Sequence, residues 1–245
     1  ENRQWELHQF RSRYHREEVT NNRGGWAKLE FSKTEHLTSE GYFTYLKEFK
    51  GGHSLNAVAG YSYFEKNGEN FNAENYDFGV EGLKYWDLES GSYLTDGKAK
   101  MGSKKDITER LFALYARANY SYNDKYMVTA TIRHEGSSKF AAENRWGNFW
   151  ALSGGWRVSG EEFMKEFDWV NDLKIRFGYG VTGNNDFDAS YMANTLSRDQ
   201  YWMLPSGSWA FVYGPSSNVN PYLGWEEKKE WNIGVDYSFF GNRMY

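Results

Sequence analysis

Hydrophobic residues recur at every second position through much of the chain. Between residues 112 and 122 one set of alternate positions is apolar or aromatic, and most positions between them are polar or small. The pattern stops at the turn-forming stretch 123–125 and resumes from 126 to 133. A period of two is that of a β-strand with one apolar and one polar face. These two segments therefore predict a hairpin with a tight turn.

The same alternation predicts strands elsewhere. The clear ones lie at 55–63, 150–158, 173–182 and 231–239. Weaker patterns lie near 4–14, 26–34 and 42–50. Together these segments give about nine strands. A short helix is predicted near 159–167, because Ser159 and Glu162 have the spacing of a capping box and Phe163, Met164 and Phe167 supply an apolar side.

Strand length and loop length distinguish a membrane barrel from a soluble β-sandwich. The strands hold about 10–12 residues, and at a tilt of about 45° such a strand spans roughly 25 Å, the height of the apolar band of an outer-membrane barrel. The connections are short at 51–53, 123–125 and 241–243, intermediate at 159–172, and long at 66–108, 136–147 and 183–228. In an up-and-down sheet this order gathers the long loops at one end, as in outer-membrane barrels.

The aromatic residues follow the same parity. Those of the apolar parity at the short-turn end predict a membrane-interface girdle of Tyr120, Tyr122, Tyr126, Trp156 and Tyr237. The opposite parity predicts a polar face turned to a water-filled lumen, with Arg117, Arg133, Arg157, Lys174, Arg176 and Asp236. The pattern therefore favours an all-β, transmembrane antiparallel barrel over a sandwich.

Composition narrows the classes further. The chain has 245 residues, 19% of them aromatic, yet its mean hydropathy is −0.83 and it contains no cysteine. The aromatic content argues against disorder, and the missing cysteine excludes disulfides and thiolate zinc sites. A net charge of −4 argues against a nucleic-acid binder. No apolar run is long enough for a membrane helix.

The second half of the chain carries long, ordered motifs. They are TATIRHEGSSKF at 129–140, NRWG at 144–147, GWRVS at 155–159, YGVTGN at 179–184, NPYLGWE at 220–226 and WNIGVD at 231–236. This half resembles the barrel of SusC/RagA-type TonB-dependent outer-membrane transporters. The resemblance is dense from 110 to 245 and thin from 1 to 109. It departs from the family at Arg133-His134-Glu135 and Phe149-Trp150, without upsetting strand parity.

The resemblance implies a fold and a transport function. Residues 1–245 would form about nine to ten strands of a 22-stranded barrel with long extracellular loops and one short periplasmic helix. The plug domain and the TonB-contacting segment would lie outside this stretch. The implied activity is nutrient import across the outer membrane of a Gram-negative bacterium, most often of an oligosaccharide and sometimes of a peptide. The implied partners are a SusD-like surface lipoprotein that acts as a lid, the TonB complex and membrane lipid.

The long connection 183–228 holds the candidate binding residues. Its aromatics would stack on a sugar, contact a lid protein or pack on one another, and the candidates are Tyr191, Tyr201, Trp202, Trp209 and Tyr213. Asp186 and Asp188 offer oxygen ligands for calcium, but they lack the spacing of a calcium loop, so an Asx turn is the simpler interpretation. No cofactor is otherwise expected.

No pattern indicates catalysis. The histidines are scattered, and no nucleophile elbow or phosphate-binding glycine loop occurs. We therefore expect a transporter fragment that is not an enzyme. Two alternatives from other classes stay open at this point: a secreted carbohydrate-binding β-sandwich that uses the same aromatics, and a β-sheet glycosidase.

Overall fold

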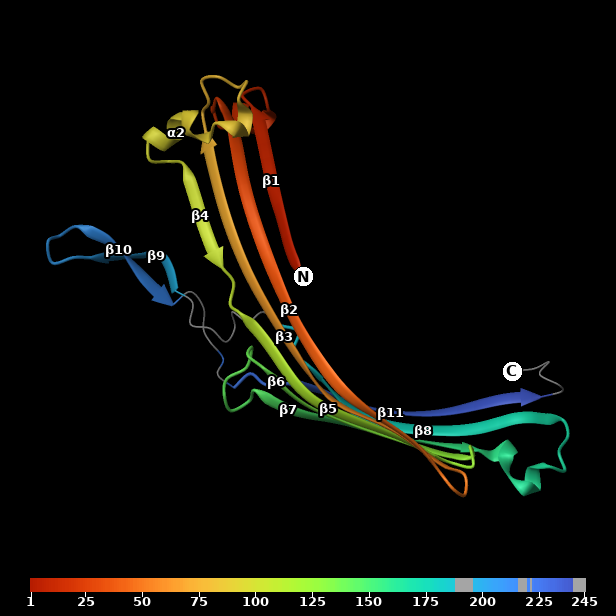
Figure 1. The fold of residues 1–245 in the computed structure, drawn as a ribbon. Helices are drawn as coiled ribbons and strands as arrows, with labels where there is room; N and C mark the ends of the chain where they lie inside the picture. The colour runs from red at the N-terminus through yellow and green to blue at the C-terminus, as the bar shows by residue number, and fades with distance from the viewer. Residues whose placement is uncertain (188–195, 216–219, 221, 240–245) are drawn as a thin grey trace. The chain divides into compact units, whose positions relative to one another are not determined.

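The computed structural model describes residues 1–187, 196–215, 220 and 222–239, and it is built mainly of long antiparallel strands (Figure 1). Two compact units are present, residues 1–37 with 65–108 and residues 38–64 with 109–245. The boundary falls within the two longest strands, β2 (Gly25–Phe49) and β3 (His53–Tyr76). Among the described residues, no helix is long and apolar enough to cross a membrane.

The strands form an open meander. They pair in the order β1-β2-β3-β5-β6-β7-β8-β11, and β4 pairs with β3. The other bounds are β1 Asn2–Ser12, β4 Lys100–Lys105, β5 Glu109–Tyr122, β6 Tyr126–Ser137, β7 Trp146–Arg157, β8 Val170–Asn184 and β11 Glu226–Phe239. Sequence neighbours lie side by side, as an up-and-down barrel requires. Because β1 and β11 lie at opposite ends of the order, the sheet is a part of a barrel wall and not a closed barrel.

In the second unit one sheet face is apolar and exposed. Strands β5 to β8 and β11 have 12 to 15 residues each, enough to cross the apolar part of a membrane at a barrel tilt. Apolar residues of alternate positions are 36% to 54% exposed, namely Phe112, Leu114, Val128, Ile132 and Ile175. A sandwich would bury these side chains under a second sheet, so the structure contradicts that alternative and confirms the predicted barrel fold.

The first unit has a core of its own beside short helical segments. Trp26, Tyr76 and Phe78 are buried, and the guanidinium of Arg11 stacks 4.3 Å above the Trp26 ring. The segments are α1 Arg16–Thr20, η1 Lys84–Trp86, η2 Leu88–Ser90 and α2 Ser92–Thr95. The carboxylate of Glu18 is fully buried and pairs with Arg23 Nε at 2.8 Å. This core orders the polypeptide of the connection predicted at 66–108.

Several strand boundaries differ from the predictions. The segments 26–34 and 42–50 are one continuous strand, β2, and β3 continues to Tyr76 instead of ending near 63. The connections predicted at 66–108 and 183–228 contain β4 and a separate hairpin of β9 (Leu196–Met203) and β10 (Trp209–Pro215). Residues 35–41, the end of β3 and β4 are mostly polar, so these stretches carry no period of two. The predicted turn at 241–243 lies outside the described residues.

The predicted short helix is a second correction. Residues 158–169 form two 3₁₀ turns, η3 (Val158–Gly160) and η4 (Glu162–Met164), and no α-helix. The Ser159 hydroxyl donates a hydrogen bond to Asp172 at 2.7 Å and does not cap a helix. The sequence has the spacing of a capping box, but the Ser159 hydroxyl bonds to Asp172 of β8 and no side-chain cap forms.

Candidate functional site

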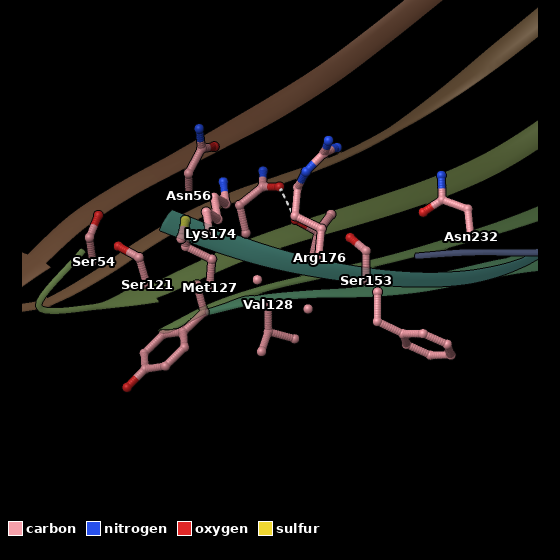
Figure 2. A pocket seen from close by; sticks show the side chains of 15 residues that line it. Ser54, Asn56, Ser121, Met127, Val128, Ser153, Lys174, Arg176 and Asn232 are labelled. Carbon is pink, nitrogen blue, oxygen red and sulfur yellow. Dashed lines mark hydrogen bonds between the residues drawn. The ribbon is translucent and has the colours of Figure 1, made fainter. Parts of the chain in front are cut away.

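The polar positions of the second unit share one face of the sheet. Gly155 of β7 lies opposite Arg176 of β8, and Asn232 of β11 lies opposite Gly178. In Figure 2 the side chains of Arg176 and Asn232 point to one side of the sheet and Val128 points to the other. The polar and apolar alternate positions predicted from the sequence therefore lie on opposite faces of the sheet.

Two adjoining hollows lie in this polar face, with volumes of about 400 and 470 Å³. They share three lining residues, Thr129, Ser153 and Asn232. Gly155 contributes to the first hollow and Gly178 to the second, and the lack of a side chain at both positions deepens the surface. Hydroxyls, amides and a few cations line the hollows, so they present hydrogen-bonding groups to a polar solute.

The charged residues predicted on this face are mostly paired. The ion pairs join Arg133 to Glu135 at 2.8 Å, Arg157 to Asp172 at 3.1 Å and Arg176 to Asp236 at 2.7 Å. Neither Arg117 nor Lys174 has an ion-pair partner among the described residues. Most charges on this face are therefore neutralised in pairs. Arg117 and Lys174 can interact with solvent, with a solute or with another segment.

Four residues of the predicted aromatic girdle lie in one row of ring contacts and hydrogen bonds at the short-turn end. His53, the first residue of β3, contacts the Tyr120 hydroxyl through Nδ1 at 2.6 Å and stacks on Tyr122 at 4.6 Å. The Tyr122 ring stacks on Tyr126 at 6.3 Å. The apolar bodies stay on the apolar face while the polar tips find partners, as amphipathic rings do at a membrane interface.

The row continues across β7. The Tyr126 hydroxyl and the Trp156 indole N–H both donate to Glu161, at 2.5 and 3.0 Å. Tyr237 of β11 stacks on Phe239 at 5.3 Å. The structure therefore brings four of the predicted girdle residues into one contact chain, while Tyr237 lies in a second cluster.

A small aromatic core orders the opposite, long-loop end of the second unit. Phe140 lies 5.1 Å from Phe187 and 5.0 Å from Trp225, and Phe149 lies 5.1 Å from Trp225. Phe140 is 2% exposed, and the Trp225 indole donates to the Arg145 carbonyl at 3.0 Å. Residues from three connections are thereby held together above the strands.

Exposed aromatics concentrate on the β9–β10 hairpin. Tyr201, Trp202, Trp209 and Tyr213 are each more than half exposed. The Tyr201 ring packs on Phe211 at 4.4 Å, across the two strands. Among the described residues, a ring contact inside the hairpin is seen for Tyr201, while Trp202, Trp209 and Tyr213 are exposed. The remaining candidate, Tyr191, lies outside the described residues.

The calcium candidate Asp186 lies in a turn. The backbone N–H of Asp186 donates to the Asn184 side chain at 2.9 Å, which is an Asx turn. Asp188 lies outside the described residues. Within the described part of the chain, no three acidic, histidine or cysteine side chains come together as a metal site.

Some functional candidates had no clear signal in the sequence. Glu161 and His53 join the aromatic row through contacts between segments that lie far apart in the chain, which periodicity does not report. Phe149 did have a signal, since it is a large aromatic at a position of the polar parity. Its burial against Trp225 explains that exception.

Comparisons with known proteins agree on one family. The family described as TonB dependent receptor-like, beta-barrel matches residues 1–245. TonB-dependent receptor P39 of Formosa agariphila is 34% identical over 84% of the chain, and TonB-dependent receptor SusC of Bacteroides thetaiotaomicron is 32% identical over 61%. The chain spans 19% and 15% of the lengths of these relatives.

Solved structures show the same fold. The RagAB peptide importer in its closed-closed state superposes with a TM-score of 0.69 over 89% of the chain and 23% of that chain, at 23% sequence identity. A second structure, of the RagAB peptide transporter, gives the same TM-score at 24% identity and the same coverage. The fold likeness therefore holds where sequence identity is low.

Proposed function

Because this chain belongs to the TonB-dependent receptor β-barrel family, we propose that it forms part of the wall of an importer in the outer membrane of a Gram-negative bacterium. The observation that carries the proposal is the two-faced sheet. Its exposed apolar face suits lipid, and its opposite face offers hydroxyls, amides and paired charges to water. No covalent chemistry is required of such a wall.

We propose an oligosaccharide as the imported nutrient. Sugars need many hydrogen-bonding groups and flat aromatic surfaces, and the polar face and the β9–β10 hairpin supply one each. A peptide is the second candidate, because the RagAB structures of similar fold are of a peptide importer. Transport would use energy relayed by TonB through parts of the protein beyond these residues.

The hairpin also suits contact with a SusD-like lipoprotein lid. Its apolar side chains are exposed on a two-stranded unit, and such a unit is marginally stable alone. Cover by a partner at the external mouth would stabilise it. Substrate contact and lid contact make different demands on the same side chains, so one set of variants tests both.

We expect the hairpin tryptophans to matter for binding. In the full-length protein, Trp202→Ala and Trp209→Ala should each weaken oligosaccharide binding about tenfold or more, as truncation of buried interface tryptophans does. Isothermal titration with oligosaccharides and with peptides measures this effect. Trp86→Ala, a similarly exposed tryptophan of the first unit, is the matched control.

The outcomes separate the candidates. Binding of peptides alone would overturn the oligosaccharide proposal and leave the importer proposal intact. Unchanged titrations together with loss of the co-purified lipoprotein would assign the tryptophans to the lid. Binding of neither ligand class by full-length protein reconstituted with its lid would contradict the import proposal.

A further inference from the structure

The connection between β7 and β8 carries a group of exposed aromatic side chains. Phe163, Phe167 and Trp169 are 57%, 44% and 50% exposed. Figure 1 shows this connection as the coiled segment that joins β7 to β8 at the short-turn end of the sheet. A group of large exposed rings is unusual in a turn surrounded by water, because it leaves a patch of apolar surface in contact with water.

Hydrogen bonds tie the start of the connection to both faces of the sheet, Ser159 to Asp172 of the polar parity and Glu161 to the exposed apolar face. Glu161 accepts from the Tyr126 hydroxyl and the Trp156 indole, whose rings belong to the exposed apolar face. Lys125 adds an ion pair to Glu161 at 3.3 Å. Glu161 therefore lies beside the aromatic row, on the apolar side of the sheet.

Ring contacts join the far end of the connection to the same face. Trp169 lies 5.4 Å from Phe239, which stacks on Tyr237 of the apolar parity of β11. Phe167 meets Trp169 edge-on at 6.4 Å. Phe167 and Trp169 thus belong to the cluster of Tyr237 and Phe239 on the apolar parity of β11. The start of the connection, at Glu161, contacts the aromatic row of β6 and β7.

We propose that residues 161–169 lie on the phospholipid headgroup region of the periplasmic leaflet, with Phe163, Phe167 and Trp169 inserted at the acyl boundary. The occupant follows from continuity with the lipid-facing surface of the barrel. Rings at this depth gain apolar contact while their backbone stays hydrated. The charged neighbours suit the headgroup layer, since Glu162 and Lys165 pair with each other at 2.7 Å. The connection would then act as an interfacial anchor beyond the strand ends.

Site-specific fluorescence tests the anchor in the full-length protein. Phe163→Cys and Phe167→Cys are labelled with bimane, with any cysteine elsewhere in the full chain replaced by serine. The protein is reconstituted in phosphatidylethanolamine–phosphatidylglycerol vesicles that contain lipids with a doxyl group at acyl carbon 5 or 12. Glu166→Cys, an exposed position of the same connection, is the matched control. A heat-dependent shift on gels establishes that each variant is folded.

The proposal expects lipid quenching at 163 and 167, stronger from carbon 5 than from carbon 12. At 166 it expects quenching by aqueous iodide instead. Iodide quenching at all three positions would place the connection in water and overturn the proposal. Protection of 163 and 167 from both quenchers would show that protein covers the rings, and would overturn it equally.

Discussion

Single glycines decide how the aromatic core at the long-loop end packs. A Cβ built on Gly183 would lie 2.1 Å from the Cζ atom of Phe149, and one on Gly147 would lie 2.4 Å from it. The Phe149 ring therefore rests on the two glycines, with Trp225 against it. The glycines serve close approach of a ring, a role that the period of two does not reveal.

We expect Gly183→Ala to destabilise the barrel. The added methyl forces the Phe149 ring off its place, and overpacking of this kind costs about 1–3 kcal/mol. Gly178→Ala is the control on the same strand, because its nearest neighbour, Asn232 Oδ1, is 3.5 Å from the built Cβ. The midpoint of thermal unfolding of the full-length protein, followed by the gel shift, should fall for the first variant only. Equal unfolding midpoints for the two variants would contradict the close packing of the Phe149 ring on Gly183.

The aromatic row predicts a pH dependence at Glu161. The Tyr126 hydroxyl, and then the Trp156 indole, lower the pKa of the Glu161 carboxyl below its ordinary value. A carboxyl with a lower pKa in the folded state stabilises the fold above its unfolded pKa of about 4.3, and this contribution is lost as the pH falls through the folded value.

We therefore expect Glu161→Gln to reduce the fall in Tm between pH 7 and pH 3. Glu166→Gln, an exposed carboxylate of the same connection, should leave the fall unchanged. Thermal unfolding of the three proteins in the same detergent measures the difference. A fall that is as steep for Glu161→Gln as for the parent protein would show that this carboxylate does not couple to folding.

At the scale of elements, the sequence was informative where each strand has two different environments. The ends of strands β5 to β8 and β11 were predicted within a few residues. Each of these strands has one apolar and one polar face, and that difference produces the alternation in the sequence. The first unit and the residues that join 26–34 to 42–50 lack that contrast, so β2 and β4 were misjudged. The two 3₁₀ turns at 158–164 depend on Asp172 of β8, a contact that a local motif does not specify.

Cross-strand ion pairs on the polar face should contribute little stability. Arg176 of β8 and Asp236 of β11 are each about half exposed, and such pairs contribute about 0–1 kcal/mol. A double-mutant cycle with Arg176→Gln and Asp236→Asn should therefore give a coupling free energy of unfolding below about 1 kcal/mol. A coupling free energy of several kcal/mol would mean that the ion pair is shielded from water, which would contradict a water-exposed polar face.

At the scale of the whole molecule, the two faces of the sheet suit two different media, lipid on one side and water on the other. The chain is polar on average, with a mean hydropathy of −0.83, yet one face of its sheet exposes Leu114, Ile132 and Trp231 at 51% to 69%. Such a surface is stable only against lipid or another apolar partner. The family explains the pattern, since a barrel wall needs apolar side chains at every second position only.

Spin-label scanning of β6 in the full-length protein tests this claim most directly. Cysteines at 127 to 132 carry the label in vesicles, and collisions with oxygen and with a water-soluble nickel chelate are measured by electron paramagnetic resonance. We predict the highest collision rates with oxygen at Val128, Ala130 and Ile132, and the highest rates with the nickel chelate at Thr129 and Thr131. Both accessibility profiles should repeat every two residues, in opposite phase. Uniformly low oxygen accessibility, or two profiles in phase, would contradict a lipid-facing wall.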